Sequence, residues 1–168
     1  MRLGTRTVAL LLALIVVAAF VVPTTMAKAA KPDKKEKWQT EGGGWINSTV
    51  PDNKSTFGFE AIVKTNKKGT ENMGNLKYDD HGAHIKVKGN VEMLDIDKVA
   101  GTATLKGMAK VTNATGAKMM LPYEVNVMAG KKGVGTFMIT LPDTPDFLPG
   151  GYSNSDVLLM GGHIKVDP

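Results

Sequence analysis

Residues 56–64, TFGFEAIVK, decide the fold class because apolar and polar side chains alternate along them. Four apolar side chains share one face of this segment: Phe57, Phe59, Ala61 and Val63. Thr56, Gly58 and Glu60 fall on the opposite face. Alternation with a period of two is typical of a β-strand, whereas an amphipathic helix repeats about every 3.6 residues. The segment therefore predicts a strand with one buried face.

The same period recurs along the rest of the chain, in residues 76–78, 83–94, 99–111, 119–127 and 137–141. In 119–127 the inward face is expected to begin at Met119. Short polar turns separate several of these segments, including NATG at 113–116 and GKKG at 130–133. No amphipathic helical pattern follows residue 30. We expect an all-β antiparallel meander of about seven to nine strands.

A meander with one apolar face buries that face in one of two ways. The sheet can close into a barrel, or two sheets can pack as a sandwich. We expect a closed or nearly closed barrel, with the β-sandwich as the alternative. Closure would pair residues 42–46 with residues 161–166 and so remove two exposed edges.

The first 29 residues have the order of a secretory signal peptide. Arg2 and Arg6 are basic, residues 8–22 are an unbroken apolar run, and Ala27 and Ala29 supply small side chains at alternate positions. This order predicts export and cleavage after Ala29. The alternative is an uncleaved anchor, which would be the protein's contact with a membrane. Either reading places the protein outside the cytoplasm or in the cell envelope.

The predicted signal is followed by two further parts. Residues 30–41 are rich in lysine and are expected to form a linker, in which Trp38 is the one large apolar side chain. Residues 42–168 are expected to form a single all-β domain. The chain has no cysteine, so it has neither disulfides nor a thiol for lipid attachment. A domain of this size buries enough apolar surface to fold without disulfides.

The net charge of the chain argues against nucleic acid as a partner. The formal net charge is +5, but Arg2, Arg6 and Lys28 belong to the predicted signal. The remainder has 18 lysines against 16 acidic residues, a net charge of +2, and no arginine. Arginine makes the bidentate contacts with phosphate and guanine that are common in such interfaces. We therefore expect no nucleic-acid binding.

Several short motifs in the predicted domain resemble one known family. They are GGGWI at 42–46, TFGF at 56–59, GNL at 74–76, Asp80-His81, GYS at 151–153 and GGHI at 161–164. In this order and spacing they are similar to the post-COAP-1 domain, a module of exported prokaryotic proteins whose function is uncharacterised. The similarity covers nearly all of residues 42–166. It implies an extracellular setting and no particular chemistry.

Asp80, His81 and His84 are the densest group of candidate metal ligands. Carboxylates and imidazoles bind divalent metals, and a turn at these residues would bring the two imidazoles together. In a straight strand, an offset of three places His81 and His84 on opposite faces. We therefore expect a polar strand end with no bound metal.

The sequence contains no pattern of residues that indicates catalysis. It has no cysteine nucleophile, no Gly-x-Ser-x-Gly motif and no His-Glu-x-x-His motif. We expect a protein that is not an enzyme and that uses no cofactor.

Two functions from different classes agree with these patterns. The first is a non-catalytic β domain that interacts with components of the envelope or cell surface. The second is a soluble carrier that holds a small apolar or aromatic ligand inside a barrel. In the carrier, the cavity would be lined by Trp45, Phe57, Phe59 and Tyr123.

Overall fold

The computed structural model describes residues 36–66, 69–155 and 157–167, and all the regular elements among them are β-strands. The predicted signal peptide at 1–29 lies outside these residues. The strands are β1 (Glu36–Asn47), β2 (Lys54–Asn66), β3 (Gly69–Asp80), β4 (Ile85–Asn90), β5 (Met93–Asp97), β6 (Thr102–Thr112), β7 (Lys118–Met128), β8 (Gly130–Lys131), β9 (Thr136–Leu141), β10 (Tyr152–Ser153), β11 (Val157–Leu158) and β12 (Gly161–Asp167). No helix in this part of the chain is long and apolar enough to span a bilayer.

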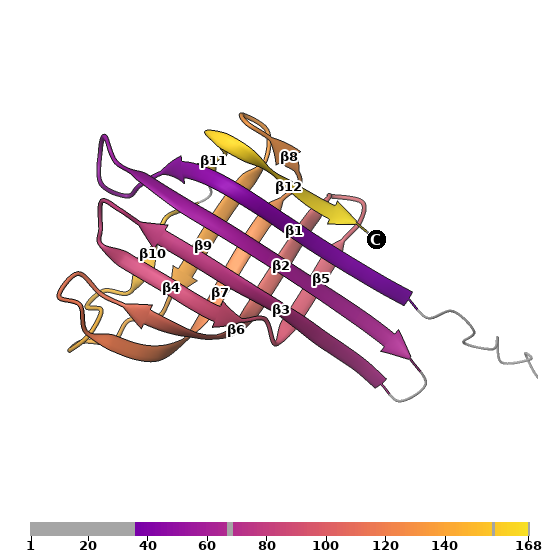
Figure 1. The fold of residues 1–168 in the computed structure, drawn as a ribbon, viewed down its shortest axis with the longest axis horizontal. Helices are drawn as coiled ribbons and strands as arrows, with labels where there is room; N and C mark the ends of the chain where they lie inside the picture. The colour runs from indigo at the N-terminus through magenta and orange to yellow at the C-terminus, as the bar shows by residue number, and fades with distance from the viewer. Residues whose placement is uncertain (1–35, 67–68, 156, 168) are drawn as a thin grey trace, which may run out of the picture. The chain divides into compact units, whose positions relative to one another are not determined.

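The strands form one antiparallel sheet, with the order β10-β9-β7-β6-β4-β3-β2-β1-β12-β8. The sheet curls through 230° into a half-barrel. In Figure 1, β1, β2 and β3 cross in front of β6, β7 and β9 at a steep angle. The prediction of an all-β antiparallel meander is confirmed. Nine of the described strands are longer than two residues.

The predicted pairing of the first and last strands is also confirmed. Gly42 lies opposite Ile164, and Trp45 lies opposite Gly161. Glycines allow this pairing, because a Cβ on Gly44 would lie 2.1 Å from the carbonyl oxygen of Gly161. Gly162 has a φ of 94°, a conformation that favours glycine.

Residues 130–135 contact β12 and the segment before it. β8 continues directly from β7 and pairs with β12, with Gly130 opposite Ile164. Gly133 N donates to Leu159 O at 2.8 Å, and Leu159 N donates to Gly135 O at 2.8 Å. These bonds join the turn between β8 and β9 to the segment between β11 and β12.

The domain begins earlier than predicted, because β1 starts at Glu36 within the expected linker at 30–41. Lys37 pairs with Lys64, and Trp38 pairs with Val63 and packs against the core. Thr40 is fully buried, and its hydroxyl donates to Lys165 O at 2.8 Å. Only the inward side chains of this strand are buried. Its outward side chains are largely charged, so the sequence shows no apolar run that would indicate a strand.

The inner face of the sheet holds one continuous apolar core. Its centre is aromatic: the rings of Phe57 and Phe137 stack at a centroid distance of 4.3 Å, and Tyr78 stacks on Phe137 at 5.8 Å. Burial of such rings is the largest single apolar contribution to a core of this kind. The apolar face predicted for residues 56–64 is thus part of the core of the half-barrel.

One predicted inward residue is not buried. Met119 is 42% exposed, whereas Leu121 and Tyr123, which follow on the same face, are buried. Met119 is the second residue of β7, so it lies at the end of the strand next to the largely exposed turn at residues 113–116.

Candidate functional site

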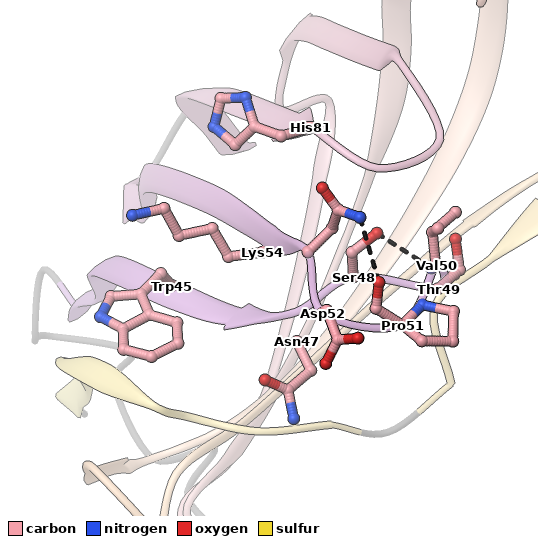
Figure 2. Close-up of a pocket in the computed structure, with 10 residues that line it drawn as sticks. Trp45, Asn47, Ser48, Thr49, Val50, Pro51, Asp52, Lys54 and His81 are labelled. Atoms are coloured by element: carbon pink, nitrogen blue, oxygen red, sulfur yellow. Dashed lines mark hydrogen bonds between the residues drawn. The ribbon is translucent and has the colours of Figure 1, made fainter.

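A polar groove lies at the turn between β1 and β2, at one end of the half-barrel. Its volume is about 670 Å³. Figure 2 shows Trp45 of β1, Lys54 of β2 and His81 of the β3–β4 turn extending to the same side. The groove is lined by Trp45, Asn47, Ser48, Thr49, Val50, Pro51, Asp52, Asn53, Lys54 and His81.

Asp80 lies beneath this groove and is fully buried at the end of β3. Two hydroxyls of the β1–β2 turn donate to its carboxylate, Ser48 at 2.5 Å and Thr49 at 3.3 Å. The backbone N–H groups of Gly82 and Ala83 donate at 2.9 and 3.0 Å.

A fifth donor to Asp80 comes from a distant part of the chain. The hydroxyl of Tyr152 in β10 donates to Asp80 Oδ2 at 2.5 Å. Because the Tyr152 hydroxyl uses its only proton for Asp80, it accepts a hydrogen bond from the Tyr78 hydroxyl. The two hydroxyl oxygens are 2.6 Å apart. The network therefore joins the β1–β2 turn, the β3–β4 turn and β10.

The pKa values of the network follow from this geometry. Burial by itself raises the pKa of Asp80, but the hydrogen bonds from Ser48, Tyr152, Ala83 and Gly82 outweigh it and hold the pKa at about 2. Burial, partly offset by hydrogen bonds, raises the pKa of Tyr78 to about 12. Burial, together with the negative charge of Asp80, raises the pKa of Tyr152.

These protonation states suit a structural role for the network. Asp80 is ionised at neutral pH with its lone pairs already engaged, so it is a poor general base. Tyr78 and Tyr152 are neutral, so neither is a nucleophile. A carboxylate that accepts five hydrogen bonds from three segments instead fixes those segments relative to one another. The network is a structural support for the groove.

The three candidate metal ligands do not converge on one point. Asp80 is buried, whereas the side chain of His81 is 48% exposed and its Nδ1 lies 3.8 Å from Asp79 Oδ1. His84 is exposed, with a φ of 55° in the tight β3–β4 turn. Among the described residues, no group of three or more histidine, cysteine, aspartate or glutamate side chains is placed to hold a metal ion.

The four predicted cavity-lining residues do not surround one space. Phe57, Phe59 and Tyr123 are buried in the core, but Trp45 lies on the outer face and is 37% exposed. The prediction is wrong for Trp45 because position 45 alternates with the inward Gly44 and Ile46. Trp45, Phe57 and Tyr123 each border a different surface hollow.

The residues that complete the Asp80 network were not predicted from the sequence. Tyr152 and Asp80 are 72 positions apart, so no local spacing in the sequence connects them. The one signal was that both fall in motifs of the suggested resemblance, at 80–81 and 151–153. The structure shows that these two motifs meet in the core.

Comparisons with known proteins give no relative for this chain: no family model, no curated protein and no solved structure matches it.

Proposed function

We propose that this protein is an exported, non-catalytic β domain that acts through contacts of its outer surface with components of the cell envelope. One observation carries the proposal. Asp80 is the only buried carboxylate in the described residues, and five donors of the protein itself occupy it. The one buried charge of the described residues is therefore used for folding, and the other charged groups are at least partly exposed.

The packing of the interior favours this proposal over the carrier. Phe57, Phe59 and Phe137 lie against one another with centroid distances of 4.3 to 6.3 Å. Rings packed in this way occupy the space that a carrier would keep for its ligand. As a finer description of the fold, we propose a nearly closed barrel whose margins meet through residues 130–135.

Co-sedimentation with isolated envelopes tests the proposed function. The exported protein is purified and mixed with envelope fragments of its own host, and the pelleted fraction is measured as the envelope concentration rises. We expect saturable binding, and no turnover of the envelope polymers. A protein that stays in the supernatant at all envelope concentrations would contradict the proposal. A small molecule released from the purified protein on unfolding would favour the carrier.

A further inference from the structure

Three lysines form a row across the outer face of the sheet. Lys77 in β3 lies directly opposite Lys88 in β4, and Lys88 lies directly opposite Lys110 in β6. All three side chains are exposed. Neighbouring strands are about 4.8 Å apart, so the row presents one positive charge per strand at that interval. We call these three residues the lysine row.

Among the described residues, no lysine of the row forms an ion pair. The ion pairs between lysine and carboxylate in the described part of the chain are Lys86–Asp79, Lys106–Glu124 and Lys165–Glu41. None of them includes a lysine of the row. Like charges directly opposite one another destabilise a sheet. The folded domain therefore carries a repulsion that a bound anion would relieve.

Two glycines continue the row on the adjoining strands. Gly58 in β2 lies opposite Lys77, and Gly43 in β1 lies opposite Gly58. A Cβ on Gly58 would meet nothing within 4 Å, whereas a Cβ on Gly74 would lie 2.2 Å from Glu60 O. Glycine inside a strand weakens it and often marks the close approach of a ligand. Nothing within the domain requires glycine at position 58.

A surface hollow of about 420 Å³ lies over part of this row. Gly58, Lys77 and Lys88 line it, together with Lys86 and Asp79. Asp79 brings little negative charge, because Lys86 Nζ lies 2.8 Å from its Oδ2. The floor of the hollow is therefore open at the glycine, and its free charges are positive.

The geometry points to the lysine row and Gly58 as a binding site for a linear anionic polysaccharide that carries carboxylates. Such a chain would lie across the strands, with successive carboxylates at successive lysines. Its sugar units would rest over Gly58 and Gly43, where no side chain stands in the way. The inference rests on the proposed function and names the class of envelope component that the outer face contacts.

The neighbours of the row favour a polysaccharide over nucleic acid. Asn75 and Thr112 flank the row with polar side chains, and Met120, which is 57% exposed, lies opposite Lys110 at one end of the row. The described residues contain no arginine, and the lysine row has no aromatic side chain on which bases would stack. A hydrated, flexible polyanion suits lysine, whose charge is a strongly hydrated point on a flexible stem.

Binding to polygalacturonate, a linear polyuronate, tests the inference. The full-length exported protein is titrated with the polymer, and neutral dextran serves as the polymer control. We expect binding to polygalacturonate that weakens at least tenfold when salt rises from about 50 mM to about 500 mM, because the contacts are ionic. The triple variant Lys77→Gln, Lys88→Gln, Lys110→Gln should lose at least tenfold in affinity. The control triple Lys37→Gln, Lys64→Gln, Lys132→Gln changes the net charge equally and should stay within twofold of the parent.

Gly58→Thr separates binding from folding. A β-branched residue suits an open strand position better than glycine, so the variant should melt at a higher temperature than the parent. It should nevertheless bind polygalacturonate at least fivefold more weakly, because its side chain enters the hollow. Unchanged binding by Gly58→Thr would overturn the role given to the glycine floor.

Four further results would overturn the inference. They are equal losses in the two triple variants, equal binding to dextran, tighter binding to DNA, and tighter binding to vesicles of anionic phospholipid. The envelope assay keeps the two proposals distinct. If the lysine-row triple still pellets with envelopes, this inference fails and the proposed function stands. If the parent binds polygalacturonate but not envelopes, the proposed function fails.

Discussion

The buried cluster around Asp80 and the exposed lysine row differ in how their charges are compensated. Asp80 is fully buried, and five hydrogen-bond donors surround one negative charge. Lys77, Lys88 and Lys110 are exposed, and three positive charges face one another with no carboxylate paired to them. Water screens the second arrangement but not the first.

The glycines of the two regions differ in the same sense. A Cβ on Gly82, beside Asp80, would lie 2.4 Å from Ser48 Oγ, so the internal packing dictates glycine there. A Cβ on Gly58, beside Lys77, would meet nothing within 4 Å. Groups whose identity the domain itself explains maintain the fold. Groups that reduce stability and have no packing role within the domain are candidates for contacting a partner.

The largest expected effect is that of Asp80→Ala. The change leaves donors from Ser48, Tyr152 and two backbone N–H groups without an acceptor in a buried place, so we expect a loss of more than about 3 kcal/mol in the free energy of unfolding. Urea unfolding followed by circular dichroism measures it. Asp79→Ala is the matched control, since the partners of Asp79 are the exposed side chains of Lys86 and His81, and it should cost less than about 1 kcal/mol. Equal losses would remove the distinction between the two regions.

The pH dependence of stability should be the next largest effect. The pKa of Asp80 is lowered from 3.8 to about 2 in the folded protein. A lowered folded-state pKa gives stability that is present above the unfolded pKa and lost as the pH falls through the folded one. We expect Asp80 to contribute about 2 kcal/mol above pH 4, lost between about pH 4 and pH 2. Urea unfolding across this range should show a steeper loss for the parent than for Asp80→Asn, and parallel curves would contradict the assignment.

Tyr152→Phe should have a smaller effect than the loss of Asp80. It removes one donor to the carboxylate and the acceptor for Tyr78, so we expect a loss of about 1 to 2 kcal/mol. Tyr78→Phe removes only the outer hydrogen bond and should cost less. Thermal unfolding of both variants and of the double variant gives the coupling between the two hydroxyls. Additive losses would show that the tyrosines do not form one network.

The smallest effect, and the one of opposite sign, is expected at the lysine row. Lys88→Gln removes the central charge, so the folded domain should gain roughly 0.5 kcal/mol at low salt. The gain should fade as salt rises, because screening already weakens the repulsion in the parent. Melting temperatures of the parent and the variant at low and high salt measure this. A variant that is less stable than its parent at low salt would show that Lys88 has a favourable role within the fold.

Much of the fold could be predicted from alternation, but not its margins. Residues 56–64 and the turns at 113–116 and 130–133 indicate strands and hairpins through local rules. The early start of β1 at Glu36 was missed because charged side chains hide a strand with only a few inward residues. The exposure of Met119 was missed because alternation shows which face a residue lies on, but not where along the strand burial ends.

The sequence by itself determined the class of fold, because period-two alternation and short turns act over a few residues. It also determined the candidate ligands of each kind, but not which of them meet. Only the tertiary structure brought Tyr152 to Asp80 across 72 positions and turned Trp45 outward. Only the register of β3, β4 and β6 placed the three lysines in one row, since each lies in a different strand. The physical reason is that burial and pairing depend on contacts between distant segments, which a local pattern does not encode.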